Sequence, residues 1–494
     1  NYTYTTDSKT KTDTKYARPL MALLGYDIPE TQATNGFNLE SQTPSIADVR
    51  QMGTVSHSLP VLLTQEGKAV AKLVDDKVVI TSEDRKDYVM FGSTQGLLHV
   101  VDAKDGTEKF SFLPKEMLEK QKDTLLKGAG TLAGGKEALY YGIDGEWVAH
   151  TVYVTKPDGT LTVNGAVRNI IGGTEEDIEN LKGKQWVYGG MRMGGRSYYS
   201  LDLTDIDAPE LKFHIDPATA KVYSKANPTG KTFAAIANMG QSWSKPRLDY
   251  VNWKGQRKLV MFVGGGYDAG GPDGDGLFAN GIRTGYVGYE YYNYKQAKTG
   301  CGATDITCSD SKKGAGVYMF DADSGDLLWY ADSETTNAST SGSSVGTAIP
   351  HLTNTDLKYS VVSEIKTIDR NNDGIVDHIY FGDLAGQAFR IDFKNDVNFN
   401  TQATKILNLN QTDGTSPRFY LPPVFTAHHS EDRKEGAHVV VATFVSGNKS
   451  SPLLATTDSH TTTGKLSALV LQYDGVYAVY DYDIHPNGTF YPQS

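Results

Sequence analysis

The chain has few cysteines, no long apolar run and fewer basic than acidic residues. Only two of its 494 residues are cysteine, and no run of about 18 apolar residues occurs, so no transmembrane helix is predicted. Its 48 lysines and arginines face 59 aspartates and glutamates, for a net charge of −11. Because nucleic-acid binding draws its affinity from clustered basic side chains, this balance argues against a nucleic-acid-binding protein. It fits the surface of a secreted protein.

The two cysteines, Cys301 and Cys308, lie close together in a loop rich in glycine, aspartate and serine. Such a pair predicts a local disulfide bond in an oxidising compartment, and the alternative is two free thiols. The chain begins at Asn1, with neither an initiator methionine nor a charged-then-apolar leader. We therefore expect a mature segment, or a part of a longer protein.

Glycine and tyrosine are plentiful, with 51 and 29 residues, and strong helix formers are rarely clustered. This composition favours many short strands joined by glycine turns. Two segments, Phe91–Asp102 and Phe381–Asp392, align without gaps as strand, glycine turn and strand. A second pair, Asp102–Gly106 and Asp321–Gly325, repeats an Asp-to-Gly turn, and Ser197–Asp205 is a looser copy. These repeats predict hairpins.

Hairpins that cannot bury their own faces must stack on their neighbours, and stacking around an axis gives a β-propeller. The sequence thus predicts an all-β fold, an irregular propeller with loop insertions and few short helices. The largest insertion is expected from about residue 268 to 313, and a helix from Pro114 to Lys127. We interpret residues 1–45 as a leader strand plus linker, and residues 46–494 as the propeller domain.

Residues 369–377 form the most informative stretch, because oxygen side chains occupy its first, third, fifth and ninth positions. These are Asp369, Asn371, Asp373 and Asp377, with Gly374 sixth and the main-chain carbonyl of Ile375 seventh. Alternating oxygens around a central glycine predict a loop that binds one Ca²⁺. The twelfth position, a glutamate in helix-loop-helix calcium sites, is Tyr380 in an expected strand, so Asp377 must replace that ligand. The alternative is a turn whose side chains cap their own backbone.

Two further segments carry weaker signals. Asp268, Asp273 and Asp275 could hold a second cation, although their irregular spacing favours a flexible acidic loop. The tyrosines of residues 286–294 are dense enough for a contact surface, and packing across a strand is the alternative. No converging set of catalytic residues is found, so we expect a protein that is not an enzyme.

Six segments in order resemble one known family, the C-terminal propeller of the PilC/PilY proteins of bacterial type IV pili. The resemblance covers roughly residues 47–453. The segments are Gly53–Val61, Gly96–Glu108, Gly194–Asp202, Ser242–Pro246, the loop 369–377 and Gly447–Leu453.

This resemblance implies a seven-bladed modified propeller of an exported protein, at the pilus tip, the outer cell surface or the periplasm of a Gram-negative bacterium. It implies one Ca²⁺, held by the five loop ligands, that governs whether pili persist or retract. Minor pilins and other pilus tip components are the implied partners, with roles in pilus biogenesis, adhesion, twitching motility and virulence. Contact with a host-cell or abiotic surface is expected through the family's N-terminal domain, which this chain lacks.

Two other functions stay open. The segment Asp321–Trp329 looks like the blade repeat of quinone-cofactor dehydrogenases, but their pocket needs adjacent cysteines, and here the cysteines are seven apart. The chain could also be a structural scaffold with an incidental ion.

Overall fold

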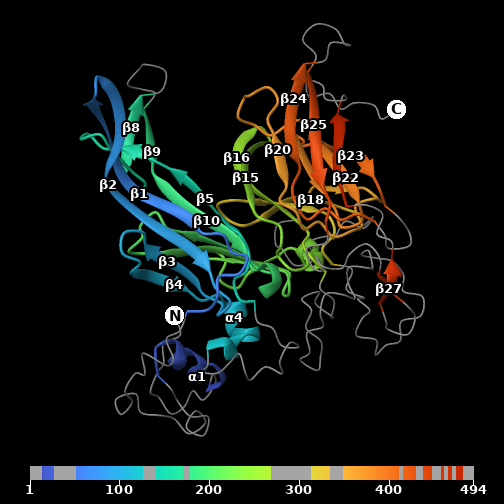
Figure 1. The fold of residues 1–494 in the computed structure, drawn as a ribbon, viewed down its shortest axis with the longest axis horizontal. Helices are drawn as coiled ribbons and strands as arrows, with labels where there is room; N and C mark the ends of the chain where they lie inside the picture. Colours follow the sequence, from blue (N-terminus) through green and yellow to red (C-terminus); the bar gives the residue numbers. More distant parts are fainter. Residues whose placement is uncertain are drawn as a thin grey trace. The chain divides into compact units, whose positions relative to one another are not determined.

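The computed structural model describes residues 14–26, 52–125, 141–170, 178–268, 313–333, 349–410, 416–429, 438–447, 458–460, 466–469 and 474–481. Within these ranges the secondary structure is almost entirely β, and the α-helices are α1 (Thr14–Leu23) and α4 (Lys115–Lys120) (Figure 1). Neither helix is long and apolar enough to cross a membrane. The chain forms two compact units, residues 1–62 with 88–144, and residues 63–87 with 145–494.

The first unit contains both α-helices. The leader was predicted as a strand, and this is wrong for residues 14–23, which form α1. Pro19 and Ala22 are buried three residues apart on one face of this helix. The helix ends at Leu23 and is capped at Gly25, which has φ of 94°; the amides of Gly25 and Tyr26 donate to the carbonyls of Ala22 and Met21. This is a Schellman cap, which needs a residue with positive φ.

The predicted helix over Pro114–Lys127 is shorter than expected. Pro114 is the N-cap of α4, which ends at Lys120, and a 3₁₀ turn follows over Lys122–Leu125. The helix stops because Gln121 leaves helical geometry, with φ of −133°, while its amide donates to the carbonyl of Met117. The rest of this unit is a meander of the end of β2 (Lys77–Gly92), β3 (Leu98–Asp102) and β4 (Glu108–Phe112).

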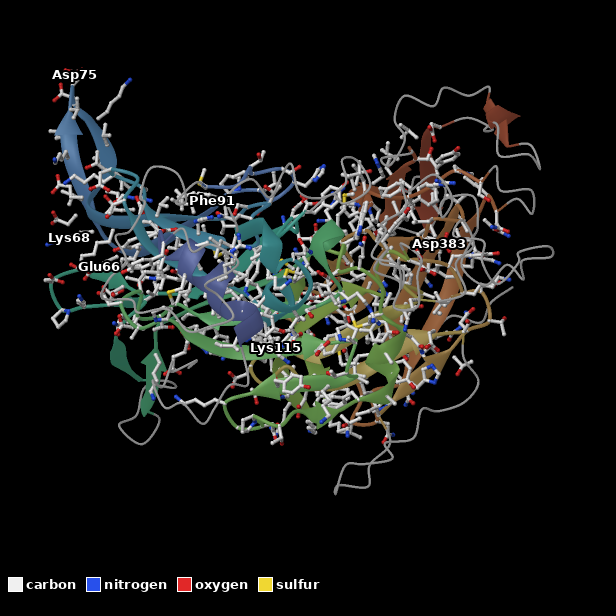
Figure 2. All side chains as sticks on the ribbon, turned by 90° about the horizontal axis from the view of Figure 1, so that it is seen from below. Glu66, Lys68, Asp75, Phe91, Lys115 and Asp383 are labelled. Atoms are coloured by element: carbon white, nitrogen blue, oxygen red, sulfur yellow. The ribbon has the colours of Figure 1, made fainter. Side chains whose placement is uncertain are left out.

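The second unit begins with a long hairpin of β1 (Val61–Val74) and β2. Asp75 and Asp76 form its turn with φ of 48° and 58°, and Figure 2 shows Asp75 at the tip. Two positive-φ residues are typical of a type I′ turn, which matches the twist of paired strands. Near this turn Leu73, Val78 and Ile80 are 71%, 70% and 74% exposed. The tip of the hairpin therefore lies outside the hydrophobic core.

Four sheets follow in chain order, and their strands are antiparallel except for the last strand of the second sheet. The first is β5 (Trp147–Val152), β10 (Lys184–Gly190), β11 (Tyr198–Asp202), β12 (Glu210–Asp216), β13 (Lys221–Ser224) and β14 (Lys231–Thr232). The second is β15 (Arg247–Trp253), β16 (Gln256–Gly264), β17 (Val317–Asp321) and β18 (Leu327–Asp332), with β19 (His351–Thr353) added in parallel. The third is β20 (Lys366–Ile368), β21 (His378–Gly382), β22 (Gln387–Phe393) and β23 (Thr401–Asn408). The fourth is β24 (Val424–His429), β25 (His438–Val445) and β28 (Val476–Asp481).

Smaller ladders complete the second unit. They are β1 with β7 (Thr160–Thr162) and β6 (Val154–Thr155), β8 (Ala166–Ile170) with β9 (Ile178–Lys182), and β26 (Asp458–His460) with β27 (Leu466–Leu469).

Each of the first three sheets packs an apolar face on the next sheet in the chain. The residues that meet are Tyr188 and Phe213 with Met261 and Phe320 at the first junction, Phe262 and Trp329 with Ile379 and Phe389 at the second, and Tyr380 and Ala388 with Ala442 and Phe444 at the third. Sequential face-to-face packing of short meanders is how propeller blades bury apolar area. The predicted all-β, irregular propeller is confirmed, while the number of seven blades and the boundary at residue 45 stay predictions.

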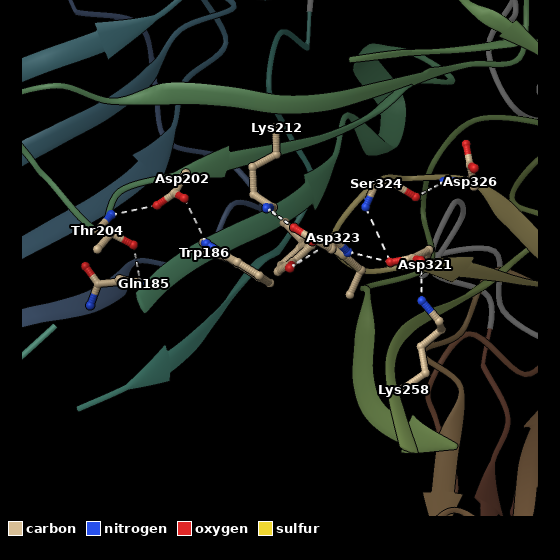
Figure 3. Close-up of polar contacts among 12 residues, drawn as sticks. Gln185, Trp186, Asp202, Thr204, Lys212, Lys258, Asp321, Asp323, Ser324 and Asp326 are labelled. Carbon is tan, nitrogen blue, oxygen red and sulfur yellow. Dashed lines mark hydrogen bonds and ion pairs between the residues drawn. The ribbon is translucent and has the colours of Figure 1, made fainter. Parts of the chain in front are cut away.

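The predicted turns are present in both copies of the repeat. Gly96 and Gly386 have φ of 88° and 78°, which only glycine adopts without strain. The Asp-to-Gly turns match too, because Asp102 and Asp321 each accept a hydrogen bond from the amide two residues on, at 2.8 Å. Asp202 of the looser copy does the same at 2.9 Å, as Figure 3 shows. The same figure shows Lys258 paired with Asp321, at 2.7 Å. The repeated sequence segments therefore form turns with the same glycine conformation and the same aspartate hydrogen bond.

Candidate metal site in the β20–β21 loop

The loop of residues 369–377 joins β20 to β21, which pair with each other as far as Ile368 and His378. The amide of Asp377 donates to the carbonyl of Ile368 at 2.9 Å, so the two ends of the loop are tied together. The amide of Val376 donates to the carbonyl of Tyr250 in β15, at 2.8 Å. The strands of two blades thus hold the base of this loop.

The glycine in the middle of the loop is required by its backbone. Gly374 has φ of 80°, and a Cβ atom there would lie 3.3 Å from Nη2 of Arg257. Asn372, with φ of 59°, is of a residue type that tolerates this region. The loop therefore turns where its sequence predicted, although a guanidinium group lies next to it.

Hydrogen bonds to the loop backbone hold its first, third and fifth side chains. Asp369 accepts from the amides of Asp373 at 3.2 Å and Gly374 at 2.8 Å. Asn371 accepts from the amide of Asp373 at 3.1 Å, and Asp373 accepts from the amide of Ile375 at 2.8 Å. Each carboxylate oxygen has a second lone pair, so these bonds order the oxygens without using all their capacity.

Asp377 differs from the other loop carboxylates because it is half-buried. One of its oxygens accepts from the amide of Arg370 and the other from the side-chain amide of Asn395, both at 2.9 Å. Burial raises the pKa of Asp377, and the charges of Asp373 and Asp369 raise it further, against the opposing effects of the Arg370 amide and the His378 ring. The ionised loop therefore carries three carboxylates and, in Arg370, one guanidinium, so its own net charge is negative.

The donor set of this loop fits Ca²⁺ in kind, but the side chains are not drawn together. Among the described residues, no three histidine, cysteine, aspartate or glutamate side chains form a group that could hold a metal ion. Carboxylates alone would thus not complete the coordination. The loop also supplies the Asn371 carboxamide and the Ile375 carbonyl, both oxygen ligands that Ca²⁺ accepts.

The other candidate residues fall largely outside the described ranges. Asp268 ends one of those ranges, and the remaining residues of the acidic cluster, the disulfide pair and the tyrosine segment lie beyond them. These are Asp273, Asp275, Cys301, Cys308 and residues 286–294. The second cation site, the disulfide bond and the contact surface therefore stay predictions.

A buried network of charged groups lies behind the loop, and the sequence analysis missed it. Arg390 on β22 donates to both oxygens of Asp392, at 2.7 and 3.0 Å, and to Asp481 on β28, at 2.5 Å. His378 and Tyr380 on β21 complete it, through Asp392 at 2.6 Å and Asp481 at 3.0 Å. The alternation of Arg390 and Asp392 along β22 was a signal that their side chains share a face. No local pattern indicated Asp481.

A second arrangement missed by the sequence analysis resembles a hydrolase triad in its order. Ser93 Oγ lies 3.0 Å from Nε2 of His99, whose Nδ1 lies 2.7 Å from Glu108. However, Ser93 is only 1% exposed, and its hydroxyl also contacts the carbonyl of Leu97 at 3.4 Å. A nucleophile must be accessible to its substrate, and Ser93 is buried. We therefore interpret these hydrogen bonds as stabilising the β2–β3 turn.

Comparison with known proteins gives structural neighbours only. No family model and no curated protein matches the sequence. The C-terminal domain of PilY1 from Pseudomonas aeruginosa is similar over 83% of this chain and 60% of that chain, with 16% identity and a TM-score of 0.42. This chain thus spans less than two thirds of that neighbour, which belongs to the family that the sequence motifs resemble.

Two other neighbours are a quinohemoprotein alcohol dehydrogenase from Comamonas testosteroni and BamB from Moraxella catarrhalis. The first has 12% identity and a TM-score of 0.26, over 78% of this chain and 54% of that one. The second has 11% identity and a TM-score of 0.22, over 88% of this chain and 95% of that one. These likenesses concern the fold alone.

Proposed function

We propose that this chain is a non-enzymatic, calcium-binding propeller module of a type IV pilus biogenesis and adhesion protein. In this proposal, calcium occupancy of the loop 369–377 controls pilus extension against retraction, and minor pilins are the partners. The observation that carries the proposal is the loop itself. Its oxygen side chains follow the calcium pattern, its glycine has the required backbone, and the pKa of Asp377 is raised by burial and by the neighbouring carboxylates.

The loop residues would act by neutralisation and closure. A bound Ca²⁺ would neutralise part of the negative charge of Asp369, Asp373 and Asp377. Asp369 and Asp377 lie at opposite ends of the loop, next to the first and last strands of the β20–β21 hairpin. Holding both ends would order the edge of this blade, so that it offers a fixed surface to a pilus component.

The pilus context rests on the motifs that resemble the PilC/PilY proteins. It is consistent with a structural neighbour from that family, although that likeness carries no functional argument. The expected location is the surface or periplasm of a Gram-negative bacterium, and adhesion and twitching motility follow from the same resemblance.

The experiment is a count of surface pili in a bacterium that makes this protein, with and without calcium in the medium. We expect pilus number to respond to calcium in the wild type and to stop responding in an Asp369→Ala strain. Asp396→Asn is the matched control, because Asp396 lies on a neighbouring loop and accepts backbone hydrogen bonds in the same way. If both variants respond like the wild type while the wild-type protein binds calcium, the ion is incidental and the chain is a scaffold.

A further inference from the structure

A side chain from a second loop holds Asp377. Asn395 follows β22, and its side-chain nitrogen donates to Asp377 Oδ1 at 2.9 Å and to the carbonyl of Val376 at 3.2 Å. These two acceptors lie at the end of the loop 369–377, eighteen or nineteen residues away in sequence. Asn395 has φ of 55°, a conformation that asparagine tolerates better than most residues.

The orientation of the Asn395 amide is fixed by its partners. Turning the amide over would place its oxygen against the Val376 carbonyl and the Asp377 carboxylate, which are both acceptors. In the observed orientation, Oδ1 of Asn395 is buried and has no hydrogen-bond partner among the described residues. A buried polar atom without a partner costs free energy. The side-chain nitrogen of Asn395 therefore keeps its hydrogen bond to Asp377, while the side-chain oxygen is left without a partner among the described residues.

The Asn395 backbone extends this link to another hairpin. Its carbonyl accepts from the side-chain nitrogen of Asn252 at 2.8 Å, and the Asn252 oxygen accepts from the amide of Gly255 at 2.9 Å. Both residues belong to the β15–β16 hairpin, which also accepts the amide of Val376 through Tyr250. The loop 369–377, the β22–β23 loop and the β15–β16 hairpin are thus joined around Asp377.

We infer that Asn395 is a positioning residue of the proposed calcium site. It aims the Asp377 carboxylate, the ligand that must replace the glutamate of helix-loop-helix sites. Tyr380, which occupies that glutamate's position in the sequence, cannot serve, because its hydroxyl is buried and bonded to Asp481 at 3.0 Å. This inference rests on the proposed calcium function, and it predicts that calcium orders the β22–β23 loop together with the loop 369–377.

The test compares calcium affinity in Asn395→Gly with that in the wild type, by calorimetry on chelator-treated protein. Glycine keeps the positive φ and removes only the side chain. Loss of a residue that orients a metal ligand typically weakens affinity about 10- to 100-fold, and we expect a loss in this range. Asn398→Gly is the matched control, with the same substitution in the same loop at an exposed side chain for which the described structure records no contact. It should keep wild-type affinity.

Three outcomes distinguish a failure of the inference about Asn395 from a failure of the proposed function. If Asp377→Ala binds calcium like the wild type, the proposed function is wrong. If Asp377→Ala loses calcium while Asn395→Gly binds normally, only the role of Asn395 is wrong. If Asn395→Gly lowers the melting temperature of the calcium-free protein but leaves the affinity unchanged, its role is structural, which also overturns the inference.

A measurement on the wild type does not depend on how the variants fold. Hydrogen exchange followed by mass spectrometry should show calcium-dependent protection in residues 394–400 as well as in residues 369–377. Protection confined to residues 369–377 would contradict the link through Asn395.

Discussion

Asp392 and Asp377 lie at the same end of the β21–β22 strand pair, where Asp392 pairs with His378, yet the two carboxylates have different surroundings. Asp392 is 6% exposed, and burial would raise its pKa, but the hydrogen bond from His378 and the charge of Arg390 lower the pKa below its usual value. Asp377 is less buried, and its pKa is raised chiefly by burial and further by the charges of Asp373 and Asp369. The network pairs both of its aspartates with Arg390, whereas the loop has three carboxylates and one arginine, Arg370. This excess of carboxylates in the loop favours the proposal that it binds a cation from outside the chain.

The largest loss of stability is expected from removing Arg390, the cation of the buried network. Arg390→Ala would leave Asp392 and Asp481 buried without their partner, and breaking a buried ion pair in this way typically costs about 3–5 kcal/mol of unfolding free energy. Urea denaturation measures this loss. Lys225→Ala, which breaks the exposed pair with Glu210, is the control and should shift the midpoint little. A loss no larger than that of the control would contradict the role of Arg390.

Calcium should stabilise the wild type by a smaller amount. A ligand at a concentration one hundred times its Kd raises the free energy of unfolding by about 2.7 kcal/mol. We expect a chelator to lower the melting temperature accordingly, in a thermal scan, and Asp369→Ala to melt at one temperature with or without calcium. A calcium-dependent shift of equal size in Asp369→Ala would place the ion elsewhere in the protein.

Asp383 offers a third case, a buried carboxylate with neither an arginine partner nor solvent. Burial raises its pKa to about 7, although the amides of Gln387 and Ala385 oppose this rise. Because the folded protein then holds a proton that the unfolded chain has lost, the free energy of unfolding should fall as pH rises from about 4 to about 7. This single group changes the free energy of unfolding by at most about 1.4 kcal/mol per pH unit.

Substitution with the residue at the corresponding position of the first repeat tests that slope. Asp383→Ser introduces the counterpart of Ser93, and denaturation at several pH values should give a flatter pH dependence than in the wild type. Equal slopes in both proteins would show that Asp383 stays ionised throughout this range.

The smallest effect is expected at Asp396, a partly exposed carboxylate in the β22–β23 loop that lies 3.8 Å from the amine of Lys394. The side-chain amide of Asn400, together with backbone amides of that loop, lowers its pKa. Its carboxylate therefore has partners within its own loop, including Lys394, and Asp396→Asn should change neither calcium affinity nor the melting temperature appreciably. A loss of calcium binding in this variant would extend the site beyond the loop 369–377.

The sequence predicted features that depend on neighbouring residues. Turns at Gly96, Gly386 and Gly374 follow from local conformational preference, and the hairpins around them follow from alternation along the strands. The calcium ligands were proposed from spacing within nine residues.

What the sequence could not predict depends on contacts between distant residues. Asn395 reaches Asp377 across eighteen residues, and Arg390 reaches Asp481 across ninety-one. Only the packing of blade on blade and loop on loop brings these pairs together. The α1 helix was missed because its polar, threonine-rich surroundings outweighed the short apolar face at Pro19 and Ala22.

The central claim is that the loop 369–377 takes up a divalent cation. A crystal structure determined with ample calcium tests it most directly. The account predicts one ion bound by Asp369, Asn371, Asp373, Asp377 and the Ile375 carbonyl, with oxygen distances of about 2.3–2.6 Å. Density for water alone at that place, with the side chains still bonded to the loop backbone, would contradict it.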